Sequence, residues 1–214
     1  MAAYAPPARY REPSIWALYI LGLLPGIYAF YLGLTDQLGA DPVRTFEHSL
    51  GIWALRFLCL GLLITPLRDL ARLNLIAYRR ALGLLAFYYV LAHFTIYLTL
   101  DRGMILASIA SDIFKRPYIM LGMLGLLLLI PLALTSNRWS MRKLGPRWIT
   151  LHKAVYIILP AGLLHFVLSR KSFTLEPAFY TGIVILLLGY RMIRPALMRR
   201  KADKRKFVQP QQSH

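Results

Sequence analysis

The stretch YIMLGMLGLLLLIPLAL, residues 118–134, contains no charged side chain from end to end. A helix needs about 20 mainly apolar residues to cross the hydrocarbon core of a bilayer. Five other stretches also meet this requirement: 14–34, 48–67, 82–100, 149–168 and 178–193. The last is short, and Arg191 and Arg194 would act as snorkelling ends. The sequence therefore predicts an all-α integral membrane protein, a six-transmembrane helix bundle.

The composition agrees with a membrane protein. Hydrophobic residues make up 57% of the 214 residues, charged residues only 16%, and the mean hydropathy is +0.51. An ordinary soluble domain has about 25% charged residues, and an aromatic content of 13% excludes a disordered chain. The single cysteine, Cys59, excludes an intrachain disulfide, a cysteine-held iron–sulfur cluster and covalent haem attachment through C-x-x-C-H. We expect it to be a small apolar filler.

The excess of basic residues predicts the orientation. Lys and Arg number 26 against 9 Asp and Glu, a formal net charge of +17. In a membrane protein such an excess indicates loops held against an anionic lipid surface rather than a nucleic-acid partner. The tails and even-numbered connections hold 18 of these cations and the other connections hold 6. By the positive-inside rule, both termini should be cytoplasmic. We expect a cytoplasmic tail at 1–13, the helical domain at 14–194 and a basic cytoplasmic tail at 195–214.

The connection after the third span has a helical pattern of its own. Ile105, Leu106, Ile109 and Ile113 recur at helical spacing, with Ser108, Ser111 and Asp112 opposite them. This pattern fits an interfacial helix on the outer side of the membrane. A loop that touches lipid fits it equally well.

Histidines within the spans are the main functional candidates, because ionisable groups there are rare and costly. At 1.5 Å per residue, His93 lies about 16 Å and His165 about 24 Å from the cytoplasmic ends of their spans. Both should lie in the outer half of the bilayer, whereas His152 lies near the inner face. The 13 residues from His152 to His165 put their rings about 140° apart in an ideal helix. Pro160 lies between them and could kink the helix.

Two imidazoles from different spans suit haem iron better than zinc. Zinc prefers three or four ligands at one depth, with carboxylate or thiolate help, and the spans contain almost no carboxylates. Two histidines facing each other across a bundle are typical of haem ligation, here b-type. Small residues near the histidines would give a macrocycle room, and they also serve helix packing: Gly83, Ala86, Ala161 and Gly162. A proton or substrate path and plain packing remain the alternatives for these histidines.

Arg56 lies in the middle of the second span, eight residues after His48, on the same broad helix face. We consider both residues as cofactor-binding candidates, with Arg56 as a partner for a haem propionate or a quinol headgroup. A snorkelling or pore-facing arginine is the alternative. The aromatic run Phe87–Tyr88–Tyr89 is expected to serve packing.

Several stretches together resemble the MsrQ family (formerly YedZ), the haem-binding membrane subunits of periplasmic methionine-sulfoxide reductase systems. They are GADPV at 39–43, LLITPL at 62–67, RRALGL at 79–84, RPY at 116–118, and RKLGPRW at 142–148 with Leu151 and His152. The likeness covers about residues 15–195. This family is grouped with the ferric-reductase-like transmembrane domains.

The resemblance implies an electron-transfer subunit of a bacterial inner membrane, holding one or two b-type haems. It would pass electrons to a separate periplasmic molybdopterin-containing subunit that reduces methionine sulfoxide in damaged proteins. His93, His152 and His165 match the ligand histidines of the family. Where the wider superfamily has an inner histidine on the third span, this chain has Arg79. The outer haem site is therefore complete with His93 and His165, and the inner one lacks a partner for His152.

The electron donor should be a separate molecule, because no segment is long enough for the flavin–nicotinamide domain of ferric reductases. The resemblance implies a membrane quinol or a cytosolic flavin reductase as donor, and FMN as a further cofactor that no residue here locates. We expect no sulfoxide reduction by the chain alone. A proton- or ion-coupled transporter and a scaffold without a cofactor are the rival functions.

Overall fold

A computed structural model describes residues 4–170 and 174–208. Its helical elements, in chain order, are α1 (Ala8–Leu34), α2 (Pro42–Leu70), η1 (Ile76–Tyr78), α3 (Arg79–Ile96), η2 (Tyr97–Asp101), α4 (Leu106–Lys115), α5 (Pro117–Leu134), α6 (Arg138–Leu144), α7 (Pro146–His152), α8 (Val155–Leu168) and α9 (Leu175–Val208). Within the described ranges, six segments are long and apolar enough to cross a membrane: Ala8–Leu34, Pro42–Leu70, Ile76–Asp101, Pro117–Leu134, Pro146–Leu168 and Leu175–Arg199. The predicted all-α, six-span fold is confirmed.

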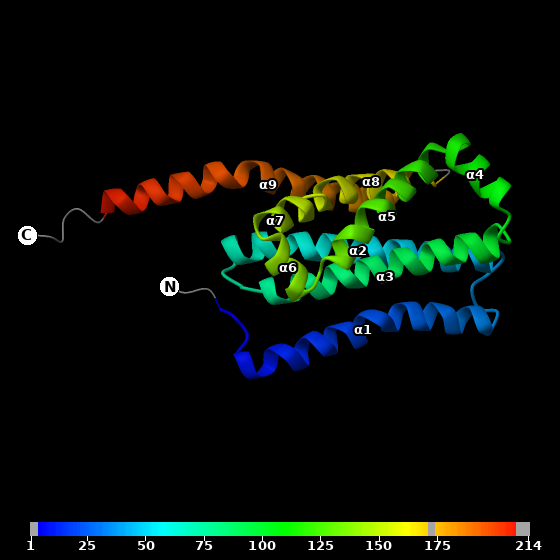
Figure 1. Ribbon diagram of the computed structural model, residues 1–214, viewed down its shortest axis with the longest axis horizontal. Coiled ribbons are helices and arrows are strands. Elements are labelled where there is room, and N and C mark those ends of the chain that lie inside the picture. The colour runs from blue at the N-terminus through cyan, green and yellow to red at the C-terminus, as the bar shows by residue number, and fades with distance from the viewer. Residues whose placement is uncertain (1–3, 171–173, 209–214) are drawn as a thin grey trace, which may run out of the picture.

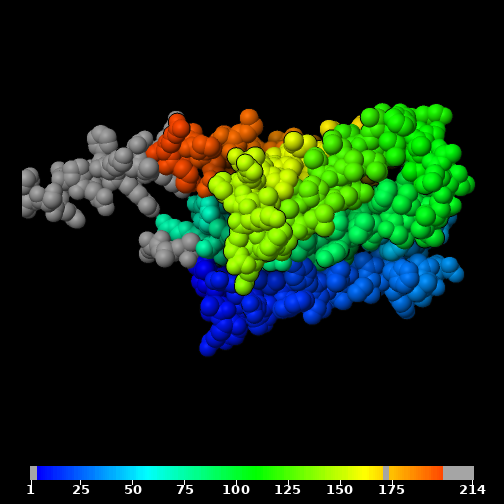
Figure 2. Space-filling model, in the orientation of Figure 1, coloured from blue at the N-terminus to red at the C-terminus, as the bar shows by residue number. Residues whose placement is uncertain are grey.

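The spans form an elongated bundle, with α1 along one flank and α4 at one end (Figure 1). The first helix begins and the last helix ends at the opposite end from α4, as an even number of crossings requires. Figure 2 shows α1 as a separate layer on the surface of the bundle. We call the end near α4 the α4 end, and the other the terminal end.

Helix α2 is the centre of the bundle. It starts sharply, because Asp41 caps the backbone N–H of Arg44 and Pro42 takes the first helical position. Eleven of its residues are buried, and it packs most closely against α3, with α1, α8 and α9 on its other sides. The three largest fully buried side chains, Leu85, Ile158 and Leu159, come from α3 and α8.

Helix α1 is held against α3 by a tyrosine hydroxyl inserted into its backbone ladder. The backbone N–H of Gly26 donates to Tyr89 Oη, which donates in turn to the carbonyl of Gly22, both at 2.8 Å. The hydroxyl thus bridges a donor and an acceptor that would pair with each other in a regular helix. A Cβ at Gly22 would lie 2.6 Å from Leu85 Cδ1, so glycine allows this close approach. Large apolar side chains cover the other face of α1, where lipid would lie; Trp16 is 67% exposed.

The connection after the third span is a helix, as one of the two interpretations predicted, but its polar face is not solvated. Asp112, expected opposite the apolar side chains, is buried. It accepts hydrogen bonds or ion pairs from Arg102 Nη2 at 2.7 Å, Arg116 Nε at 3.1 Å and the Tyr97 hydroxyl at 3.2 Å. Because a buried carboxylate needs such partners, these contacts anchor α4 to the adjoining chain.

Several helix ends differ from the sequence prediction. The fifth span is two helices, α7 and α8, interrupted at Lys153 and Ala154, and Pro160 lies inside α8. The last helix runs on through Pro195 to Val208, so the predicted basic tail is helical in its described part. Before α1, Tyr4 pairs with the loop after α2, its N–H donating to the carbonyl of Arg72 at 2.8 Å.

Candidate functional site

A cavity of about 980 Å³ lies within the bundle, with walls from α2, α3, α5 and α8. Its deeper walls are apolar and include Leu55, Leu58, Leu126 and Ile158. Charged residues line it toward the α4 end: Asp41, Arg44, Asp101, Arg102, Arg116 and Arg170. The hydrogen bond from Arg116 to the Tyr118 hydroxyl, together with the nearby Asp112 carboxylate, raises the pKa of this guanidinium. The cavity is of the size that protein ligand sites usually have.

Two histidines face each other in this cavity. His93 comes from the last turns of α3 and His165 from the last turn of α8, and their ring centroids are 6.0 Å apart with the planes at 87°. A metal–imidazole bond is about 2 Å long, so two such bonds plus the depth of each ring put the ring centres roughly 6 Å apart. The separation therefore fits one metal atom between the rings.

A backbone carbonyl fixes the tautomer of each ring. His93 Nδ1 donates to the carbonyl of Glu47 at 2.8 Å, and His165 Nδ1 donates to the carbonyl of Tyr118 at 2.6 Å. Because a carbonyl only accepts, both rings carry their proton on Nδ1. The lone pair needed for a metal bond is left on Nε2, the arrangement that metal-binding histidines usually show.

The same local device exposes both carbonyls. In a helix the carbonyl of residue i points toward residue i+4, and Gly51 stands four residues after Glu47, as Gly122 does after Tyr118. A Cβ at Gly51 would lie 3.5 Å from His93 Nδ1, and one at Gly122 would lie only 2.8 Å from His165 Nδ1. Glycine at 122 is therefore needed for His165 to reach the backbone of α5, whereas a methyl group at 51 would make an ordinary van der Waals contact with His93.

The donor set fits haem and does not fit a multi-ligand metal site. Within the described residues no group of three or more His, Cys, Asp or Glu side chains is placed to hold a metal ion. Two neutral imidazoles in a large apolar cavity suit a macrocycle that supplies the other four ligands itself. The buried Nε of Arg170, which lines the cavity, has no hydrogen-bond partner in the described part of the chain. It is a suitable donor for a haem propionate.

Of the two candidates on α2, the structure places His48 at the cavity and Arg56 away from it. His48 lines the cavity, accepts from Arg170 Nη2 at 2.6 Å and stacks on Phe166. Arg56 instead donates from Nε to the Tyr180 hydroxyl at 2.7 Å, with its guanidinium over the Trp53 ring. Sharing a broad helix face with His48 therefore does not bring Arg56 to the cavity, because its long side chain extends to Tyr180 instead.

The inner candidates, His152 and Arg79, have separate partners. His152 Nε2 donates to Thr135 Oγ1 at 3.1 Å, since that hydroxyl gives its own proton to the carbonyl of Pro131 at 2.6 Å. The His152 ring also stacks on Trp148 at 3.9 Å. Arg79 donates to Thr65 Oγ1 at 2.6 Å. Neither side chain is among the residues that line the cavity.

Comparison with known proteins identifies the family. Residues 50–163 match the model of the ferric reductase like transmembrane component. A protein of Agrobacterium fabrum (strain C58), named protein-methionine-sulfoxide reductase heme-binding subunit MsrQ, is 69% identical over 93% of this chain and 93% of its own length. The chain belongs to the MsrQ family. MsrQ proteins of Brucella anthropi and Brucella ovis are 55% and 58% identical over 92% and 88% of the chain, covering 90% and 86% of their own lengths.

Membership of the MsrQ family confirms the resemblance inferred from the motifs, and with the six apolar helices it makes this chain a multi-pass membrane protein, as predicted for a bacterial inner membrane. The matched ferric-reductase region runs from α2 into α8 and includes His93 and His152, while His165 lies two residues beyond its end. No solved structure matches the chain.

Proposed function

We propose that this chain is the haem-binding electron carrier of a protein-methionine-sulfoxide reductase system, with one b-type haem held between His93 and His165. The observation that supports this most strongly is the pair of Nδ1-protonated imidazoles with centroids 6.0 Å apart in a cavity of about 980 Å³. A relative that is 69% identical is named a heme-binding subunit.

The residues of the chain position and shield this group. The carbonyls of Glu47 and Tyr118 orient the imidazoles and increase their basicity. The apolar walls exclude water, and arginines near the α4 end would balance the propionate charges. Haem supplies reversible one-electron transfer when bound. The Thr135 hydrogen bond occupies Nε2 of His152, so we do not include a second haem at that residue.

The orientation follows from charge. The terminal end has most of the Lys and Arg residues, so we place it in the cytoplasm and the α4 end with its cavity near the periplasm. Electrons would leave there for a periplasmic, molybdopterin-containing reductase subunit that forms a heterodimer with this chain. A membrane quinol or a cytosolic flavin reductase would supply them, with FMN as a further cofactor of the donor side.

The visible spectrum of the purified chain, oxidised and then reduced with dithionite, tests the proposal. We expect about one haem per chain, its loss in both His93→Ala and His165→Ala, and unchanged content in the matched variant His152→Ala. A colourless protein after expression with ample haem would instead favour a transporter. Normal haem content in the first two variants would refute the ligand assignment.

A further inference from the structure

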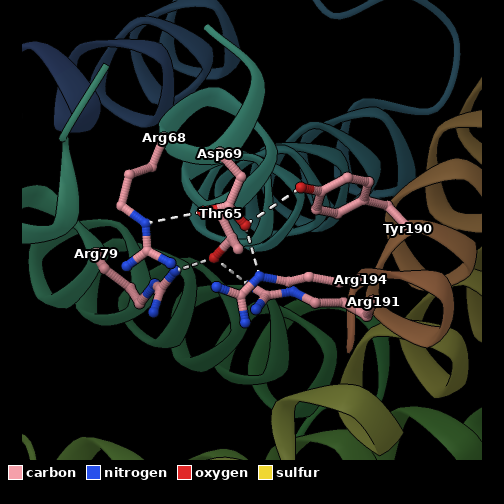
Figure 3. A network of polar contacts seen from close by, with 7 residues as sticks. All are labelled: Thr65, Arg68, Asp69, Arg79, Tyr190, Arg191 and Arg194. Atoms are coloured by element: carbon pink, nitrogen blue, oxygen red, sulfur yellow. Dashed lines mark hydrogen bonds and ion pairs between the residues drawn. The ribbon is translucent and has the colours of Figure 1, made fainter. Parts of the chain in front are cut away.

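A network of polar side chains, four of them arginines, joins α2, α3 and α9 at the terminal end of the bundle (Figure 3). The group, which we call the arginine cluster, consists of Thr65, Arg68, Asp69, Arg79, Tyr190, Arg191 and Arg194. Asp69 accepts from Arg68 Nε at 3.1 Å, from Arg194 Nε and from the Tyr190 hydroxyl at 3.2 Å. None of these residues lines the histidine cavity.

The arginine cluster lacks a matching anion. The seven residues hold four guanidinium groups and one carboxylate, a net charge of three positive, and only Arg68 and Arg194 contact that carboxylate, Asp69. Arg79 and Arg191 both donate through Nη2 to the same neutral oxygen, Thr65 Oγ1, each at 2.6 Å. The two Nη2 atoms are therefore at most twice that distance apart, on either side of a buried hydroxyl, which brings two like charges close together. Such an arrangement is costly without a counter-ion.

One donor of the arginine cluster is also unused. Nε of Arg191 is buried and has no hydrogen-bond partner among the described residues. Buried donors in native proteins normally have a partner, so an isolated one indicates a missing acceptor. A phosphate group would supply both the acceptor oxygens and the negative charge that the guanidinium groups lack.

An apolar groove lies directly beside these guanidinium groups. A cavity of about 490 Å³ between α8 and α9 is lined by Arg191 and Arg194 together with Tyr156, Leu188, Met192 and Pro195. Met192 is 82% exposed, so the groove opens on the outer surface of the bundle, where lipid would lie. Both arginines lie near the end of the sixth span, Leu175–Arg199, the depth of phospholipid headgroups. The groove therefore has two guanidinium groups at one end and apolar side chains along its walls.

We infer that the arginine cluster and this groove bind one anionic phospholipid, with its phosphate on Arg191 and Arg194 and an acyl chain along Leu188 and Tyr156. Basic pockets between spans on the cytoplasmic side are a recognised form of lipid site. The excess positive charge selects a lipid with net negative charge over a zwitterionic one. This inference does not depend on the haem ligands, which lie in the other cavity.

Thermal unfolding of the haem-loaded protein in detergent tests the inference. We expect added phosphatidylglycerol to raise the melting temperature by about 5 °C at saturation. Phosphatidylcholine and inorganic phosphate should have little effect. Native mass spectrometry should show one tightly held phosphatidylglycerol per chain. Equal stabilisation by phosphatidylcholine, or full stabilisation by inorganic phosphate, would overturn the assignment.

Substitution then locates the lipid. Arg191→Gln should abolish both the shift and the retained lipid, whereas Arg142→Gln, a matched change at an exposed arginine of α6, should keep both. If Arg191→Gln does not fold, Arg79→Gln provides a second test, because it removes the other guanidinium group that donates to Thr65. An unchanged lipid response in the folded cluster variant would refute the site.

Discussion

At the scale of single residues, the sequence located the histidines but not what holds them. Depth counting placed His93 and His165 in the same half of the membrane, and the structure brings their rings together. The acceptors at Glu47 and Tyr118 could not be predicted, because they are backbone carbonyls and side-chain identity does not reveal them. Gly122, four residues after Tyr118, is a signal that could have indicated the acceptor of His165.

The close approach of His165 to Gly122 predicts that one added methyl group at this glycine will disturb the histidine. In Gly122→Ala the new Cβ would lie 2.8 Å from His165 Nδ1, closer than real contacts allow, and the ring must move off its carbonyl. We expect haem content to fall several-fold, or the reduced spectrum to shift, in the purified variant. Gly83→Ala is the control, because no atom lies within 4 Å of the position that its new methyl group would take. Equal haem content and identical spectra in both variants would contradict this role of Gly122.

Arg170 should affect the redox potential of the bound haem. Its buried Nε has no hydrogen-bond partner among the described residues, while its Nη2 pairs with Glu176 at 2.7 Å. Arg170 lines the cavity, and a positive charge there favours the reduced iron. Arg170→Gln should therefore lower the midpoint potential by roughly tens of millivolts, measured by a spectroscopic redox titration. Arg142→Gln, on α6, should leave the potential unchanged. A potential that rises or stays constant in Arg170→Gln would remove this side chain from the haem environment.

At the scale of elements, hydropathy was enough to find all six spans but not where they end. Hydropathy falls where charged residues begin, but Lys and Arg are good helix formers. Helix α9 therefore continues past its apolar part to Val208. The angular mismatch between His152 and His165 assumed one continuous helix. The interruption at Lys153 and Ala154 makes that comparison invalid, and nothing in the local composition marks it.

The bridge between α1 and α3 should contribute measurably to stability. Tyr89→Phe removes a hydroxyl that both accepts from Gly26 and donates to Gly22. We expect a loss of about 1–3 kcal/mol, seen as a drop of several degrees in the melting temperature in detergent. Tyr88→Phe removes a half-exposed hydroxyl from the same helix and should have little effect. Equal melting temperatures for the two variants would show that the bridge is not stabilising.

At the scale of the whole molecule, the uneven distribution of basic residues predicts an orientation that can be tested. Cys59 is buried, so a single cysteine introduced at an exposed site would be the main target for a maleimide. We expect Lys115→Cys, in α4, to react with a membrane-impermeant maleimide in intact spheroplasts. Arg142→Cys, in α6, should react only after lysis. The reverse pattern would place both termini outside and contradict the proposed direction of electron flow.

The peripheral position of α1 has a further consequence. Of the described residues that line the histidine cavity, none comes from α1; the lining begins at Asp41. The walls of this cavity come from four of the six crossings, the second to the fifth, and the family match itself begins only at residue 50. The first crossing instead makes the number of crossings even, so that both termini lie on the same side of the membrane. Without it, the amino terminus would have to be exported for the remaining helices to keep their direction.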